Sequence, residues 1–152
     1  MRYYIVDAFT DKVFHGNQAG VCLLERELPD ELMQTIAAEN NLSETAFVIK
    51  REDEYFLRWF TPDVEVDLCG HATLATAAVI LTEIEPSMQS VSFHTMSGKL
   101  TVEKNGDWFT MYFPARQLSK RGGILMCKYM GEKVAISGQA KVFMRGEIRD
   151  CM

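Results

Sequence analysis

The feature that most constrains the fold is one segment that is apolar or small on every face. It runs from His71 to about Ile84 and begins His-Ala-Thr-Leu-Ala-Thr-Ala-Ala-Val-Ile-Leu. A helix on a protein surface carries a stripe of polar side chains, and this segment has none. The sequence therefore predicts a helix that is buried all round, as if a sheet were wrapped around it.

The other apolar segments are short and typical of β-strands. A second helix is the exception: it is predicted from Pro29-Asp30 to Asn40-Asn41, with apolar residues at helical spacing. Asn105-Gly106, between alternating apolar residues, predicts a hairpin. The expected fold class is α+β, a strongly curved, mostly antiparallel sheet or barrel around one central helix. The strands are predicted at residues 3–9, 21–24, 45–50, 55–60, 91–95, 99–103, 108–113 and 141–144.

A weak internal repeat follows the hairpin. The block from Ser97 to Phe113 and the block from Arg121 to Ile136 both read glycine, strand, glycine-containing turn, strand. Two copies are too few for a solenoid array, which needs at least three.

Composition excludes several classes of function. Sixteen Lys and Arg against twenty-one Asp and Glu give a net charge of -5, which argues against nucleic acid as a main partner. No apolar run approaches the roughly 20 residues of a membrane span. The N-terminus alternates polar and apolar residues too early for a signal peptide, so we expect a cytoplasmic protein. Four cysteines and three histidines show no ligand spacing, so we expect no metal.

Three short segments collect reactive residues: 14–20, 40–45 and 67–73. The third leads directly into the apolar helix. A helix N-terminus presents unpaired amides and a positive dipole end, so the amides of Gly70 to Thr73 could hold a small carboxylate. The alternative is that Asp67 caps the helix while Cys69 and His71 simply pack.

Glu44 is the candidate in the second segment. It immediately precedes an apolar strand, where partial desolvation suits a carboxylate to proton transfer. The alternative is a solvated loop acid. In the first segment, His15 and Asn17 are candidates too, although Gly16-Asn17 is equally consistent with a tight turn.

Together these segments resemble the PhzF family of phenazine-biosynthesis-like proteins, a branch of the diaminopimelate epimerase fold. The resemblance spans nearly the whole chain, with three separate motifs in the family's order. The matching stretches are Val6-Asp7-Ala8-Phe9-Thr10 with Phe14-His15-Gly16-Asn17, then Asn41 to Phe47, Arg58 to Pro62, Cys69 to Ala75, Ser97-Gly98 and Ser137 to Ala140.

The resemblance implies an isomerase that moves a proton on a small carboxylated substrate without metal or organic cofactor. By motif, Glu44 would be the general acid/base and His71 would assist it. Substrate binding would fall to the amides of Gly70, Ala72 and Thr73, with Asn17 and Ser43. A cysteine at the position of Cys69 is a catalytic base in the related epimerases, which leaves a cysteine-based racemase as an alternative.

Two departures from the family pattern stand out. Gln18 replaces the proline that many members have after Gly-Asn, and the second domain's Asp-Pro-x-Thr-Gly-Ser-like segment is absent. Residues 1–116 resemble the first barrel domain, and residues 117–152 resemble the terminal strands of the second, joined at Ala115-Arg116. A homodimer could complete the half site. The other possibility is a catalytically incomplete remnant that binds an anion or a protein.

Overall fold

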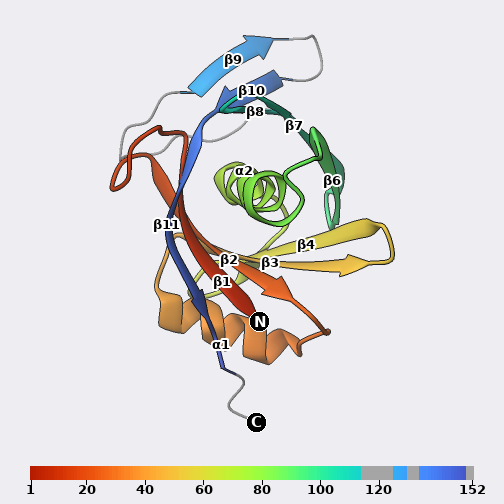
Figure 1. Cartoon of the computed structure of the whole chain (residues 1–152). Coiled ribbons are helices and arrows are strands. Elements are labelled where there is room, and N and C mark those ends of the chain that lie inside the picture. The colour runs from red at the N-terminus through yellow and green to blue at the C-terminus, as the bar shows by residue number, and fades with distance from the viewer. Residues whose placement is uncertain (114–124, 130–133, 150–152) are drawn as a thin grey trace.

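The structure is a computed structural model that describes residues 1–113, 125–129 and 134–149. A single curled sheet wraps around one central helix (Figure 1). Its strands are β1 Arg2–Ala8, β2 Asn17–Leu24, β3 Glu44–Arg51, β4 Glu54–Phe60, β5 Glu65–Val66, β6 Ser90–Thr95, β7 Gly98–Asn105, β8 Trp108–Phe113, β9 Leu125–Tyr129, β10 Val134–Gly138 and β11 Ala140–Glu147.

The central helix is α2, Gly70–Val79, which continues into one π-helical turn, η1, Ile80–Ile84. Every residue from 71 to 81 is buried, which confirms the prediction of a helix enclosed on all sides. The two buried threonines do not leave unpaired hydroxyls. Thr73 Oγ1 donates to the carbonyl of Cys69, and Thr76 Oγ1 donates to the carbonyl of Ala72 at 2.7 Å. Polar atoms inside the helix are therefore satisfied within it.

The strand order is β11-β1-β2-β3-β4-β6-β7-β8-β10-β9, with β5 paired to β4. The pairs β2/β3 and β4/β6 are parallel and the others are antiparallel, so the expected mostly antiparallel sheet is confirmed. Gln139 alone separates β10, which pairs with β8, from β11, which pairs with β1. One continuous segment thus joins the two sides of the barrel.

Gly138 stands where β10 passes into β11. A Cβ atom at this position would lie 2.3 Å from the Phe9 ring, well inside van der Waals contact. The amide of Thr10 donates to the carbonyl of Gln139 at the same place. Closure of the barrel therefore depends on a residue without a side chain at position 138.

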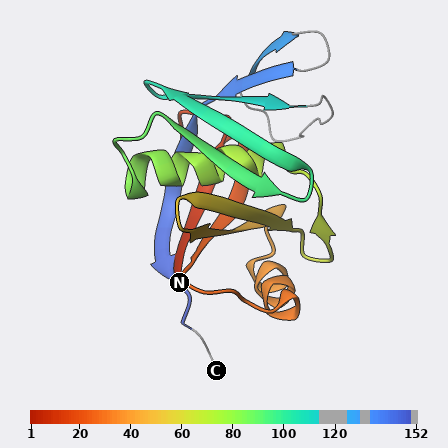
Figure 2. The same cartoon turned by 90° about the vertical axis from the view of Figure 1, so that its right-hand side faces the viewer.

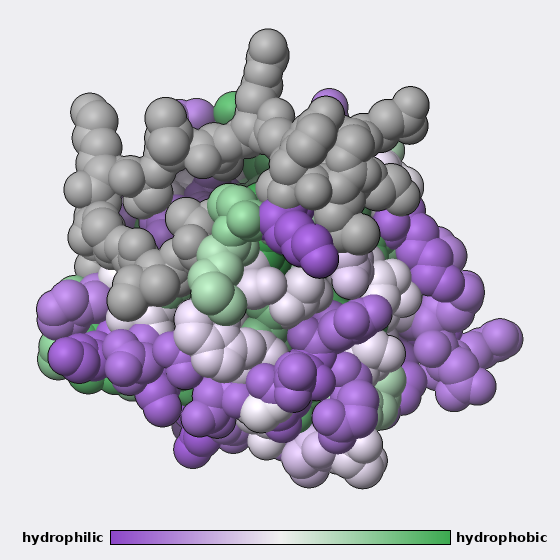
Figure 3. All heavy atoms as spheres, turned by 90° about the horizontal axis from the view of Figure 1, so that it is seen from above, coloured by the Kyte–Doolittle hydropathy of each residue, from purple (hydrophilic) through white to green (hydrophobic). Residues whose placement is uncertain are grey.

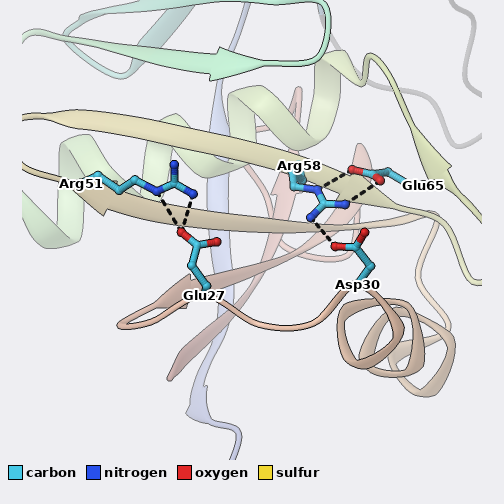
Figure 4. A network of polar contacts seen from close by, with 5 residues as sticks. All are labelled: Glu27, Asp30, Arg51, Arg58 and Glu65. Carbon is cyan, nitrogen blue, oxygen red and sulfur yellow. Dashed lines mark hydrogen bonds and ion pairs between the residues drawn. The ribbon is translucent and has the colours of Figure 1, made fainter.

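The first helix, α1, Asp30–Asn40, lies outside the barrel and packs on β3 and β4 (Figure 2). Arg58 on β4 connects it to the segment before α2 (Figure 4). Its guanidinium contacts Glu65 of β5 at 2.6 and 2.8 Å and Asp30 of α1 at 2.7 Å. Because β5 ends three residues before Cys69, this network anchors the chain that leads into the central helix.

Some details differ from the sequence predictions. The strand predicted to start at Val21 begins at Asn17, and β5 was not predicted. The N-cap residue of α2 is Cys69, and Asp67 is exposed without capping it. The junction Ala115-Arg116 and parts of the second repeat, such as Arg121 and Met130, lie outside the described residues.

The described residues of the 117–152 segment join the same sheet as the first segment. Their assignment to the family's second domain stays a prediction. Seen from above, where β9 and β10 lie, hydrophobic atoms sit among hydrophilic side chains (Figure 3), and Met126 of β9 is 56% exposed. Among the described residues, no helix has the length and apolar character needed to cross a membrane.

Candidate functional site

Glu44 and His71 meet at the end of the barrel where α2 begins. Glu44 is the first residue of β3, and His71 lies in the first turn of α2. Their Oε2 and Nε2 atoms are 3.0 Å apart, and both side chains are largely buried, with 14% and 7% exposed. The strand alternates its faces, and Ala46 and Val48 pack in the core around α2. Glu44 therefore faces the helix because it shares their face.

The two atoms that meet have hydrogen-bonding capacity left over. Neither Glu44 Oε2 nor His71 Nε2 has a hydrogen bond of good geometry with another described residue. Buried polar atoms in proteins are nearly always paired, so such atoms are typical of functional sites. A carboxylate and an imidazole in this state can exchange a proton with a small molecule that reaches both.

Cys69 contacts the other nitrogen of the same imidazole. Its Sγ is 3.4 Å from His71 Nδ1, and the thiol is 1% exposed. Burial raises the pKa of the Cys69 thiol well above its usual range, and the nearby Glu44 carboxylate raises it further. The nearby backbone amides of Ala72 and His71 oppose this rise in pKa. The balance keeps Cys69 a neutral thiol at neutral pH.

The first turn of α2 was predicted to hold a carboxylate through the amides of Gly70 to Thr73. In the structure, the Thr73 amide donates to the carbonyl of Cys69, as the first bond of the helix. The amides of His71 and Ala72 lie against Cys69 Sγ. A thiol sulfur is a weak acceptor, which a carboxylate oxygen can replace. Substrate binding at this turn stays a prediction.

The remaining candidates divide into two groups. Asn17 begins β2 and is half-buried, and it shares a strand face with Ala19, which pairs with Glu44 on the adjacent strand. Ser43 precedes β3 and is exposed. His15 is also exposed, and its Nδ1 lies 3.0 Å from the carbonyl of Val13. Asn17 thus lies on the strand next to that of Glu44, while His15 makes its contact within its own loop.

One buried acid was missed by the sequence reasoning. Asp7 on β1 is 0% exposed, and its Oδ2 accepts a 2.8 Å hydrogen bond from the amide of Phe14. Phe14 and Gly16 both have positive φ, so the loop before Asn17 is tightly turned. Asp7 is the one charged residue in the otherwise apolar strand predicted at residues 3–9, and this signal could have indicated that it binds the loop before Asn17.

A metal ion could in principle use the same cluster. One ligand atom each from Glu44, Cys69 and His71 lies within 4.8 Å of the others. However, the imidazole presents Nδ1 to the thiol and Nε2 to the carboxylate. A metal ion bound through either ring nitrogen would therefore replace one of these two contacts.

Comparison with known families bears on this geometry. The family model for PhzC-PhzF, described as phenazine biosynthesis-like protein, matches residues 6–122. The chain belongs to the PhzC-PhzF family. The match includes Asn17, Glu44 and the segment from Cys69 to Thr73, and the resemblance drawn from the sequence is confirmed.

Curated relatives agree with the family assignment. A Pseudomonas aeruginosa protein named an uncharacterized isomerase is 56% identical over 117 residues, which cover 77% of this chain and 45% of that protein. The human phenazine biosynthesis-like domain-containing protein is 46% identical over 119 residues, covering 73% of this chain and 41% of the relative. The PhzC-PhzF chain thus spans about half the length of the curated relatives it matches.

Solved structures confirm the fold. A PhzC/PhzF protein from Clostridium difficile matches with a TM-score of 0.91 and 32% identity, covering 99% of this chain and 100% of that chain. A predicted epimerase from Pseudomonas aeruginosa matches with a TM-score of 0.63 and 24% identity, covering 73% of this chain and 42% of that chain. The expected α+β, epimerase-like barrel around a central helix is therefore confirmed.

Proposed function

We propose that this PhzC-PhzF chain is an isomerase that moves a proton on a small carboxylated metabolite by cofactor-independent general acid/base catalysis. The observation that carries the proposal is the contact between Glu44 Oε2 and His71 Nε2, 3.0 Å apart and largely buried. Both atoms lack a hydrogen bond among the described residues, so both can act on a bound molecule. The relatives named as isomerases support the class of reaction.

The proposed reaction needs no oxidant or reductant. Glu44 removes a proton from a carbon next to an electron-withdrawing group, and the electron pair of the broken C–H bond moves into that group. The protonated Glu44 then returns the proton to another carbon, or to the other face of the same one. His71 donates a hydrogen bond to the oxygen where negative charge develops. The start of α2 and Asn17 hold the substrate carboxylate.

The family's second domain normally faces this site, and its aspartate-containing segment is absent from the sequence. We propose that a second copy of the chain completes the site. Exposed apolar side chains on the loop before β2 and on β11 support this interpretation. Phe14, 67% exposed, packs edge-on against Phe143 of β11 with ring centroids 5.1 Å apart. Val13 and Met144, next to them in the chain, are exposed apolar residues as well.

The experiment that tests the reaction class is solvent deuterium exchange. The protein is incubated in deuterated buffer with a panel of small 2-amino and 3-hydroxy carboxylates, and incorporation is read by mass spectrometry. We expect exchange into at least one compound, and a loss of about 100-fold or more in Glu44→Gln, as for removal of a general acid/base. No incorporation with any compound, while a two-domain relative exchanges under the same conditions, would support the remnant alternative.

A matched control is available in the chain itself. Glu54 Oε1 lies 3.0 Å from His94 Nε2 on the surface, the same pair of groups at the same distance. Glu54→Gln should therefore exchange deuterium at the wild-type rate. If Glu54→Gln and Glu44→Gln lose the same fraction of activity, the loss reflects general damage and the assignment of Glu44 is refuted.

Solution mass tests the shared site separately. We expect a dimer by light scattering at the concentration of the exchange assay. An active, strictly monomeric protein would contradict completion of the site by a second copy and leave the reaction class intact.

A further inference from the structure

The buried thiol of Cys69 has no part in the proton transfer described above, yet it contacts the imidazole that does. Sγ lies 3.4 Å from Nδ1 of His71, while Nε2 of the same ring lies 3.0 Å from Glu44 Oε2. The imidazole thus contacts the carboxylate through one nitrogen and the thiol through the other, at the first turn of α2. The imidazole can present its proton at only one of its two nitrogens while neutral.

The direction of the contact between Sγ and Nδ1 follows from the other ring nitrogen. Nε2 lies 3.0 Å from a carboxylate oxygen of Glu44, beside which a hydrogen on Nε2 is favoured over a lone pair, so Nδ1 is left as the acceptor. Burial, followed by the neighbouring Glu44 carboxylate, raises the pKa of the thiol, so it retains its hydrogen at neutral pH. The thiol therefore has a hydrogen to give, and His71 Nδ1, 3.4 Å away, is the acceptor within hydrogen-bond distance.

We propose that Cys69 is a positioning residue whose S–H group donates to His71 Nδ1 and so holds the neutral imidazole in the tautomer with its hydrogen on Nε2. That hydrogen then lies beside Glu44 Oε2 without a hydrogen bond to it, and is available to a substrate bound there. In the opposite tautomer, the Nε2 lone pair would face the carboxylate oxygen, a repulsive contact. The inference rests on the proposed function for its consequence in catalysis, and it concerns a contact that is present without substrate.

This role differs from that of a catalytic cysteine. A base must lose its proton to take one from the substrate, and the buried thiol is held in its neutral form. In many catalytic histidines, a buried hydrogen-bonding partner sets which ring nitrogen carries the hydrogen, and the Cys69 thiol has this role for His71. Replacing the thiol with a group that cannot donate should therefore act through the ring of His71.

The tautomer can be measured directly on the whole protein. Long-range ¹H–¹⁵N spectra of histidine-labelled protein at neutral pH distinguish the protonated from the unprotonated ring nitrogen. We expect His71 to carry its hydrogen on Nε2, with Nδ1 as a hydrogen-bonded acceptor. In Cys69→Ala the Nδ1 resonance should move and the second tautomer should become populated. Cys69→Ser, whose hydroxyl also donates, should restore the wild-type pattern.

Cys22→Ala is the matched control. Cys22 is also a buried free cysteine, but it packs in the smaller core beneath α1, away from His71. This variant should leave both His71 ring nitrogens at their wild-type shifts, which separates loss of the thiol contact from loss of a core cysteine. A wild-type ring with its hydrogen on Nδ1, or a Cys69→Ala spectrum in which His71 is unchanged, would overturn the proposal.

Deuterium exchange supplies the functional arm. Cys69→Ala should lower the exchange rate about tenfold through kcat, a fraction of the contribution of a complete general acid. Cys69→Ser should recover most of that loss. If the wild type shows the expected tautomer but exchanges with no substrate, the proposed function fails while the thiol contact stands. If exchange occurs and the tautomer is the opposite one, the function stands and this inference fails.

Discussion

The enclosure of α2 predicts a large energetic effect for Leu74→Ala. Leu74 is 0% exposed and lies in the core cluster that surrounds the helix. Alanine removes three carbon atoms and leaves a cavity, and changes of this kind in protein cores cost about 2–5 kcal/mol. Alanine is also the better helix former, so helix propensity does not add to the loss. Because strands or other helical residues bound the site on every side, little collapse can relieve the cavity, and we expect about 3–4 kcal/mol.

The assay is urea unfolding followed by circular dichroism, with thermal unfolding as a second measurement. For a chain of this size, about 3 kcal/mol corresponds to a fall in Tm of roughly 6–12 °C. Leu32→Ala in α1 is the control, because Leu32 is only partly buried on a helix outside the barrel. It should cost about 1 kcal/mol with the same m value.

The comparison between the two leucines decides the outcome. If Leu74→Ala costs less than about 1 kcal/mol, or no more than Leu32→Ala, then α2 is not enclosed by the sheet. The reasoning from an all-round apolar helix to a wrapped core would then be refuted.

Two further predictions concern titratable groups. Hydrogen bonds from Lys50 and Tyr55 hold the pKa of Glu85 below its usual range. The ionised carboxylate therefore stabilises the folded state in full at pH values above the pKa that Glu85 has in the unfolded chain. This stabilisation is lost as the pH falls through the lower pKa of the folded state. Glu85→Gln should therefore lower the unfolding free energy by about 1 kcal/mol at pH 7, and the difference from wild type should vanish in acid. In native protein at pH 7.5, iodoacetamide should label the exposed Cys127 and leave Cys69 unlabelled, as read by peptide mass spectrometry, because the buried thiol forms no thiolate. Labelling of Cys69 as fast as Cys127 would contradict both its burial and its neutral state.

The helices and most strands could be predicted because their signals are local. The apolar segment from His71 onward gave a buried helix, and Asn105-Gly106 gave the β7–β8 hairpin. The two-residue strand β5 has no periodicity to detect, since two residues cannot alternate. Closure of the barrel through β10 and β11 could not be predicted either, because it depends on pairing between strands more than 120 residues apart in the chain, as in Tyr3 with Gly146.

The candidate site shows the same division between local and distant information. Glu44 and His71 could be singled out because one stands at the edge of an apolar strand and the other at the start of an apolar helix. The 3.0 Å contact between them could not be predicted from the sequence, because it depends on how β3 packs against α2. Asp7 was missed because its role is to accept a hydrogen bond from Phe14, seven residues away across a loop with positive φ angles.

The placement of the pair has a consequence for how the site tolerates change. Glu44 and His71 each lie on the first turn or first residue of a core element, and neither belongs to a long loop. Their separation is therefore set by the packing of the strand against the helix. Two catalytic residues on flexible loops could keep their contact when the core shifts, whereas we expect the contact between Glu44 and His71 to be lost. Changes that move α2 along its axis should weaken catalysis before they unfold the protein, since proton transfer is sensitive to displacements of about 1 Å.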